Sequence, residues 1–369
     1  MPPLKFDPEA TVEEIAGIYR HAAFDAVVND KEDDAIQVVC RRADGTEIPL
    51  ANPARAFYFG DRVLYCEEAR RYDLGEKQRV LNTDTFNRNE RRFDELKRAC
   101  QRGFVIPFIG AGMSKSAGCP EWKEYLLNLC PDAGFDKDTM RQRLEEQGDY
   151  EGVMHDLVTK LGENRFNQDF ERDFNPPGEV TGAVLRLPDL FDSCVITTNF
   201  DRVLEKAYEK CGKAFVEKTT GRGPVGSINA FYRAIPAGER HLLKLHGNLT
   251  NAAERVLNKA EYDDAYGNDG NIHFDRPVPK LLKRLYTSFS FLFLGCSLSY
   301  DRTIQTFAKI AQDVGADSLP HHYAILACPS DATKKAGLEQ RLADAHISAI
   351  WFPEGEFELI DEMLELLGT

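Results

Sequence analysis

The sequence predicts an α/β protein with a Rossmann-like parallel sheet, a helical insertion and a small N-terminal α+β module. Short apolar runs alternate with helical segments after Gly103, which is typical of a parallel sheet covered by helices. With 369 residues, of which 43% are hydrophobic, the chain can bury one large core or two ordinary ones. We therefore expect two domains, residues 1–95 and residues 96–369.

The first domain combines helix and strand signals. Residues 11–22 have the apolar spacing of a short amphipathic helix, and Asp44-Gly45 between alternating apolar residues predicts a β-hairpin. Residues 55–68 favour a second pair of strands, and the charged segment 87–103 predicts a helix that leads into the main domain. This module is a candidate interface for assembly.

Apolar runs in the main domain predict its strands at residues 104–109, 194–199, 241–247, 291–295, 322–328 and 347–352. The segment between the first two runs is rich in helix formers and too long for a single crossover, which predicts a helical insertion beside the sheet. Pro107 lies in the first run. Because proline cannot donate to a sheet ladder, we expect either a bulge there or a strand that begins later.

Composition excludes several classes of protein. The longest apolar run, residues 289–298, is shorter than the roughly 20 residues of a membrane span, and the N-terminus does not resemble a signal peptide, so we expect a cytoplasmic protein. Nine cysteines without a CxxC pair indicate reduced thiols and no zinc site. A net charge of −14 disfavours direct nucleic-acid binding.

Small and polar residues follow the predicted strands, where open α/β sheets bind their ligands. Gly110 and Gly112 end the first strand, and glycine there lets the backbone approach a pyrophosphate at a helix N-terminus. Lys115 occupies the position of the third glycine of a GxGxxG pattern. Glycine turns after strands are also often structural, so both interpretations stay open.

The second strand is followed by Thr197, Thr198, Asn199 and Asp201. These polar groups lie where a ligand is expected, although Asn199 or Asp201 could instead cap the helix that starts near Arg202.

The third strand ends in His246, which titrates near neutral pH and is a candidate base, although a lone histidine is more often structural. The fourth strand ends in Gly295, and Ser297 follows as a possible donor to ribose or phosphate. Asp301 is expected to cap the next helix.

In this order, the glycine turn and the segments TTNFD, LHG and LGCS resemble the sirtuin family of NAD-consuming enzymes, as does AGCPEWKEYL after the turn. The resemblance runs from near Phe104 to the end of the chain. It implies that NAD is held by Gly110, Ala111, Gly112, Ser114, Thr198, Gly295 and Ser297, and that the catalytic residues are Asn199, Asp201 and His246.

One departure from the family bears on function. Protein-deacylating sirtuins carry two CxxC pairs that bind zinc, whereas this chain has no cysteine between Gly247 and Gly295. The sequence is therefore similar to the zinc-free bacterial sirtuin-like NAD hydrolases of antiphage defence, with NAD as substrate and no zinc expected. The carboxylates Glu261, Asp263 and Asp264 are candidate ligands for a weak Mg²⁺ site.

The resemblance implies a mechanism in which Asn199 holds the ribose, His246 activates water and Asp201 orients the carboxamide or that water. Two alternatives stay open: an ADP-ribosyltransferase or deacylase, and a non-catalytic nucleotide-sensing subunit. The resemblance also implies a homo-oligomer, or a partner ATPase or nucleic-acid-sensing subunit.

Overall fold

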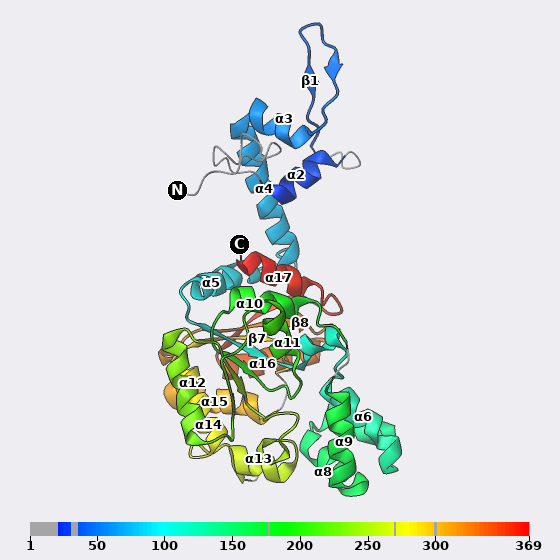
Figure 1. The fold of residues 1–369 in the computed structure, drawn as a ribbon, viewed down its shortest axis with the longest axis vertical. Helices are drawn as coiled ribbons and strands as arrows, with labels where there is room; N and C mark the ends of the chain where they lie inside the picture. Colours follow the sequence, from blue (N-terminus) through cyan, green and yellow to red (C-terminus); the bar gives the residue numbers. More distant parts are fainter. Residues whose placement is uncertain (1–20, 31–35, 176–177, 269–270, 299–300, 369) are drawn as a thin grey trace. The chain divides into compact units, whose positions relative to one another are not determined.

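The computed structural model describes residues 21–30, 36–175, 178–268, 271–298 and 301–368. The chain forms two compact units, Met1–Arg79 and Val80–Thr369 (Figure 1). Each unit has its own buried core. Most of the helix expected at residues 11–22 lies outside the described residues.

The first unit has helices α2 (Ala22–Asn29), α3 (Pro53–Gly60) and α4 (Arg62–Val80) and strands β1 (Cys40–Arg41) and β2 (Glu47–Ile48). The two strands pair antiparallel on either side of Asp44 and Gly45, so the predicted hairpin is confirmed. The Asp44 carboxylate accepts a hydrogen bond from the Thr46 amide at 2.9 Å, and Gly45 has a φ of 85°, which suits glycine.

The prediction of a second strand pair at residues 55–68 is wrong, because this segment is helical. The side chain of Asn52 caps α3 by accepting a hydrogen bond from the Arg55 amide at 2.8 Å, and a proline follows in the first turn. Ala54 and Tyr58, four residues apart, are buried on one face of this helix. The apolar residues therefore follow the helical period, which the short segment did not reveal.

The second unit is built on a seven-stranded sheet in the order β5-β6-β4-β3-β7-β8-β9, and every neighbouring pair is parallel. The strands are β3 (Val105–Ile109), β4 (Val195–Thr197), β5 (Glu217–Thr220), β6 (His241–Lys244), β7 (Ser290–Leu294), β8 (His322–Cys328) and β9 (Ile347–Pro353). The predicted Rossmann-like sheet is confirmed. Sequence analysis missed β5, an edge strand whose four residues contain no apolar side chain.

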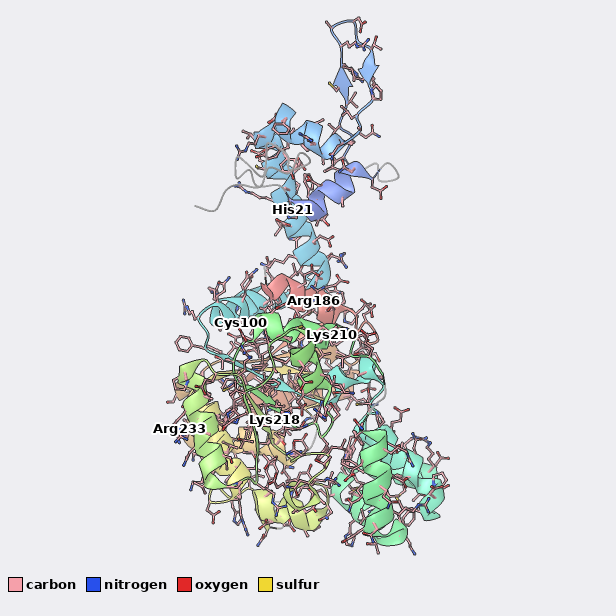
Figure 2. The ribbon with its side chains drawn as sticks, in the orientation of Figure 1. His21, Cys100, Arg186, Lys210, Lys218 and Arg233 are labelled. Atoms are coloured by element: carbon pink, nitrogen blue, oxygen red, sulfur yellow. The ribbon has the colours of Figure 1, made fainter. Side chains whose placement is uncertain are left out.

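Helices cover both faces of the sheet (Figure 1). One face packs against α12 (Val225–Ala237), α13 (Lys259–Tyr266), α14 (Pro277–Tyr286), α15 (Arg302–Val314) and α16 (Ala332–Asp344). The other packs against α5 (Asn89–Gln101), α10 (Leu187–Leu190), α11 (Val203–Lys210) and α17 (Leu359–Gly368). Arg186, labelled in Figure 2, hydrogen-bonds Asp361 of α17 at 3.1 Å and so helps to hold that helix.

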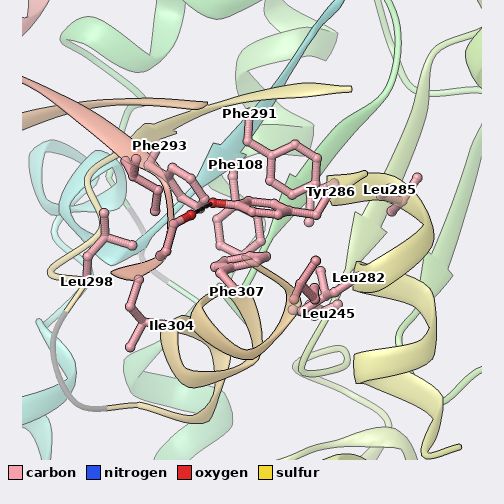
Figure 3. Close-up of a cluster of buried hydrophobic side chains, with 14 of the residues drawn as sticks. Phe108, Leu245, Leu282, Leu285, Tyr286, Phe291, Phe293, Leu298, Ile304 and Phe307 are labelled. Carbon is pink, nitrogen blue, oxygen red and sulfur yellow. Dashed lines mark hydrogen bonds between the residues drawn. The ribbon is translucent and has the colours of Figure 1, made fainter. Parts of the chain in front are cut away.

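Aromatic side chains fill the first face. Phe108 of β3 and Phe293 of β7 pack beside Phe307 of α15 and Tyr286 of α14 (Figure 3). The rings of Tyr286 and Phe307 are stacked, with centroids 4.4 Å apart. Because these large side chains come from two strands and two helices, their burial fixes how the helices lie on the sheet.

The predicted helical insertion is confirmed and consists of α6 (Trp122–Ala133), α7 (Lys137–Glu146), α8 (Tyr150–Leu161) and α9 (Glu163–Asp173). It has a separate core, which also takes in Phe200, Leu249 and Leu257. Phe200 follows β4, and its ring lies 5.2 Å from that of Phe170 of α9. The insertion is therefore anchored on the chain that leaves the carboxyl edge of the sheet.

Pro107 lies inside β3 without a bulge, so neither of the two expectations for it is correct. Its pairing with Leu292 of β7 is in regular register, while the pairing of β3 with β4 begins only at Phe108. A residue without an N–H group is accommodated where that second ladder starts.

Two turns at the carboxyl edge of the sheet are packed backbone against backbone. The amide of Gly110 donates to Leu294 O and that of Gly112 to Gly295 O, both at 2.9 Å. A Cβ atom on Gly110 would lie 2.5 Å from Gly295 O and 2.8 Å from Cys296 Cα. Close packing therefore requires a glycine at position 110.

We expect Gly110→Ala to destabilise the protein by roughly 1–3 kcal/mol, because its methyl group would force the two turns apart. Gly226→Ala is the matched control, since a Cβ at that position has no atom within 4 Å. Denaturant unfolding of both variants measures the difference. Equal stability of the Gly110 variant and the wild type would contradict this account.

Candidate active site

The candidate residues from β4 and β6 lie side by side because of the register of these strands. Thr197 pairs with Lys244, and Asn199 and His246 each follow by two residues. The neighbouring strand β3 contributes Ser114 through the short 3₁₀ helix η1 (Ala111–Ala117). Three parallel strands thus bring their polar residues to one edge, as expected for this class of sheet.

Asn199 is held by hydrogen bonds to the glycine turn. Its Nδ2 atom donates to Gly110 O at 3.0 Å and to Ser114 Oγ at 3.1 Å. Its backbone amide donates to Thr197 Oγ1, which in turn donates to Ile109 O at 2.8 Å. Neither of these side-chain contacts, the ones found among the described residues, caps α11. The amide is a fixed polar group that joins the ends of β3 and β4.

Asp201 has the capping role that sequence analysis left open between two residues. Its Oδ1 atom accepts a hydrogen bond from the Val203 amide at 2.9 Å at the start of α11. Burial raises the pKa of this carboxyl, while that hydrogen bond, the charge of Lys244 and a hydrogen bond from Ser114 oppose the rise. Asp201 and Asn199 therefore both contact Ser114.

Lys244 and Glu205 form a buried ion pair that sequence analysis missed. Lys244 Nζ lies 3.3 Å from Glu205 Oε1 and donates to Phe200 O at 3.0 Å and Asp201 O at 2.5 Å. A lysine between leucines in a strand was the available signal, because a charge there needs a buried partner. The pair holds the backbone on both sides of Asp201.

His246 is 7% exposed, and among the described residues its ring has one hydrogen-bond partner, the hydroxyl of Tyr266, which lies 2.6 Å from Nε2. The ring of Tyr262 lies edge-on to it, with centroids 5.5 Å apart. Burial lowers the pKa of His246 from 6.5 to about 4. The imidazole is therefore neutral at pH 7, which is the form that can accept a proton.

Two backbone amides of the glycine turn already donate hydrogen bonds within the protein. The amides of Gly110 and Gly112 donate to residues 294 and 295, and Gly295 has a φ of 65°. The helix after the turn is a 3₁₀ helix of seven residues, so fewer aligned amides follow than in an α-helix. Packing accounts for these glycines, and their binding of a pyrophosphate stays a prediction.

The remaining predicted NAD-binding residues lie nearer the surface. Gly112 and Ser297 are exposed, and Ala111, Thr198 and Gly295 are partly buried. The Thr198 amide donates to Ile109 O at 3.3 Å. Ala111 and Gly112 therefore form a more exposed margin beside the buried Ser114.

Two buried arginines connect the insertion with the loops beside the site, and sequence analysis identified neither. Arg302 binds both carboxylate oxygens of Glu151 on α8, at 2.7 and 2.6 Å, and also Asp263 at 2.7 Å. Arg255 binds Asn167 at 2.8 Å and Glu171 at 2.9 Å, both on α9. Their partners are distant in the sequence, so no local pattern reveals them.

The candidate side chains expose little surface to solvent. Ser114, Asn199, Asp201 and His246 have exposed fractions of 2, 7, 4 and 7%. Cavities of about 390 Å³, at Glu217 and His241, and about 910 Å³, along α15, are lined by other residues. The candidate side chains are thus largely covered by the rest of the fold.

The carboxylates that sequence analysis considered for Mg²⁺ all have partners within the protein. In the described part of the chain, no three His, Cys, Asp or Glu side chains are grouped to hold a metal ion. Glu261 accepts from the amides of Leu257 and Asn258, and Asp263 binds Arg302 and Lys259. Asp264 binds Arg222 at 2.8 Å. These contacts occupy the three carboxylates considered for Mg²⁺.

None of the described helices is both long enough and apolar enough to span a membrane.

A protein-family model matches the part of the chain that contains the three candidate catalytic residues. Residues 193–350 match the family model described as SIR2-like domain, a segment that includes Asn199, Asp201 and His246 but not the turn at Gly110.

Three relatives show what the chain is similar to. It is 25% identical over 230 residues to NAD(+) hydrolase ThsA of Cytobacillus dafuensis, covering 62% of this chain and 42% of the relative. It is 27% identical over 204 residues to NAD(+) hydrolase ThsA of Acinetobacter baumannii, covering 55% and 38%. It is 22% identical over 265 residues to Defense-associated sirtuin 2 of Bacillus subtilis, covering 71% and 24%. The matched part thus spans less than half the length of these relatives.

We expect the protein to lose stability on acidification, partly through His246. The unfolded chain takes up a proton near pH 6.5, whereas the folded state does so only near pH 4, so stability present above pH 6.5 is lost as the pH falls. Between pH 7.5 and pH 5 this residue alone contributes a loss of about 2 kcal/mol. Denaturant unfolding of the wild type and His246→Gln at both pH values measures it. The same pH dependence in both proteins would contradict the low pKa.

Proposed function

We propose that this chain, of which residues 193–350 match the SIR2-like domain, is an NAD hydrolase that cleaves NAD to nicotinamide and ADP-ribose. The names of its relatives support this substrate, and the defence sirtuin among them supports a role as an NAD-depleting effector of antiphage defence. The observation that carries the proposal is a buried, neutral histidine beside a fixed asparagine at the carboxyl edge of the sheet.

The proposed reaction breaks the bond between C1′ of the ribose and the nicotinamide nitrogen. The pyridinium ring takes the bonding electrons and leaves as a neutral molecule, so the site needs no strong acid. The ribose becomes an oxocarbenium-like cation, and water adds to C1′ as His246 takes its proton. Asn199 offers a neutral amide to hold the ribose without trapping the cation.

Asp201 has a supporting role in this proposal. Its carboxylate caps α11 and shares Ser114 with Asn199, so it orients the polar groups around the ribose. Ala111, Gly112, Ser114, Thr198, Gly295 and Ser297 form, with Gly110, the proposed path of the rest of NAD. Because several candidate side chains are buried, NAD binding needs a more open arrangement than this one.

Two other functions use the same site. Capture of the cation by a protein side chain would make an ADP-ribosyltransferase, and capture by an acyl oxygen would make a deacylase. Binding without turnover would make a nucleotide-sensing subunit. Incubating the protein with NAD and following nicotinamide and free ADP-ribose, with and without an acyl-peptide, separates these functions.

The buried site also supports control by assembly. We propose a cytoplasmic protein that acts within a homo-oligomer or beside a partner ATPase or nucleic-acid-sensing subunit, with residues 1–95 as the assembly module and residues 96–369 as the catalytic domain. A change in its neighbours on assembly would open the edge of the sheet where the candidate residues lie.

We expect His246→Ala to abolish nicotinamide release while NAD affinity changes by less than about tenfold, because the base acts mainly in the transition state. His155→Ala, an exposed histidine on α8, is the control and keeps the wild-type rate. Steady-state rates and NAD titration measure the two effects. Normal turnover in His246→Ala would remove this residue from the mechanism.

Asn199→Ala is expected to lower the rate about as much as His246→Ala. It also removes hydrogen bonds to Gly110 and Ser114, which contributes a stability loss of about 1–3 kcal/mol. Rates are therefore measured below the unfolding transition of the variant. A folded variant with the full rate would show that Asn199 only joins the strands.

The purified protein is expected to contain no stoichiometric zinc, and EDTA is expected to leave its fold and NAD cleavage unchanged. Elemental analysis and thermal melts with and without EDTA test this expectation. About one zinc per chain would bring deacylation back as the leading alternative.

A further inference from the structure

A series of hydrogen-bonded side chains begins at His246. His246 Nε2 lies 2.6 Å from the hydroxyl oxygen of Tyr266, and that oxygen lies 3.0 Å from Thr303 Oγ1. The Thr303 side chain is hydrogen-bonded in turn to the carboxyl group of Asp301. Four polar groups thus connect the end of β6 through α13 to the beginning of α15.

Two of these hydrogen-bonded side chains, Tyr266 and Thr303, lie in the protein interior. Tyr266 is fully buried and Thr303 is 5% exposed, so water does not compete for their hydroxyl groups. Burial raises the pKa of Tyr266 well above 10, so its hydroxyl keeps its proton at any physiological pH. Each hydroxyl can donate one hydrogen bond and accept others, so the direction of donation must be set at one end.

Asp301 sets that direction. Its Oδ1 atom accepts hydrogen bonds from the amides of Thr303 and Ile304, both at 2.9 Å, as the cap of α15. Desolvation raises the pKa of the Asp301 carboxyl, and these donors together with the Thr303 hydroxyl oppose the rise. Two amide donors on one oxygen favour the ionised form of the carboxyl group, which only accepts hydrogen bonds. Thr303 therefore donates to Asp301 and is left with lone pairs for Tyr266.

We propose that Tyr266, Thr303 and Asp301 are positioning residues that hold His246 in the tautomer with the proton on Nε2, leaving Nδ1 as its basic nitrogen. Tyr266 donates to Thr303, and its oxygen then accepts from Nε2–H of His246. In the described part of the chain, Nδ1 has no hydrogen-bond partner. The opposite direction, with Tyr266 donating to Nε2, would put the proton on Nδ1 and remove the base.

This inference rests on the proposed function where it concerns the reaction. The proton of the attacking water passes to Nδ1, and the resulting imidazolium keeps Nε2–H directed at Tyr266. In this arrangement the Asp301 carboxylate stabilises the positive charge through the two hydroxyl groups. No proton leaves the chain of hydrogen bonds, so the three positioning residues do not themselves react.

The tautomer is measured directly by ¹⁵N NMR of the full-length protein labelled at histidine, with the His246 signal assigned by comparison with His246→Gln. We expect the wild type to have a protonated Nε2 and an unprotonated Nδ1 at pH 7. Tyr266→Phe, which keeps the ring, is expected to mix the two tautomers. Tyr262→Phe is the matched control, because Tyr262 packs against His246 without a hydrogen bond to it.

Thr303→Val is a second, independent variant. It removes the link to Asp301 while keeping the shape of the side chain, so Tyr266 is free to donate to Nε2, and the Nδ1–H form is expected to increase. If Tyr266→Phe does not fold, this variant alone decides the proposal. A wild-type protein with the proton on Nδ1, or an unchanged tautomer in the folded variants, would overturn it.

The kinetic arm is separate from the spectroscopic one. In a protein that releases nicotinamide, Tyr266→Phe is expected to lower kcat by about tenfold or more with little change in KM, because a misdirected base affects the chemical step. An unchanged kcat would overturn the role in catalysis. A wild type that releases no nicotinamide contradicts the proposed function, yet the NMR result still decides how His246 is held.

Discussion

The contact between the turn at Gly110 and the turn at Gly295 is the constraint on which the candidate site depends. Here two neighbouring parallel strands, β3 and β7, end at the same level. The backbone amides after β3 donate hydrogen bonds to the backbone carbonyls at the end of β7. A side chain at Gly110 would separate them. Because Asn199 hydrogen-bonds to Gly110 O, the same contact also fixes the end of β4. Close packing of the two turns therefore requires glycine at position 110, independently of any ligand.

The inserted helices pack against the chain segments that leave this edge of the sheet. Phe200, between Asn199 and Asp201, enters the core of the inserted helices, so the chain that carries the polar groups also carries the anchor. Arg302 connects α8 with α13, the helix that supplies Tyr266 to His246. Movement of the insertion would therefore act on both sides of the site together.

Sequence analysis predicted the parts of the structure that depend on local pattern. Apolar runs located every strand of the sheet except β5, and glycine, threonine and histidine at strand ends located the candidate edge. The segment at residues 55–68 was misassigned because a short apolar alternation also fits one face of a helix. Lys244 and Tyr266 were missed because their roles come from partners far along the chain, at Glu205 and Thr303.

Position in the sheet separates His246 from the other buried histidines. Burial lowers the pKa of His241 and His322 as well, so a neutral imidazole alone does not indicate a base. Both of those residues are the first of their strands and lie at the amino edge, where His241 contacts Thr219 and His322 stacks on Tyr286. His246 follows its strand at the carboxyl edge, where parallel sheets bind ligands. The fold thus distinguishes a structural histidine from a candidate catalyst by the end of the strand at which it stands.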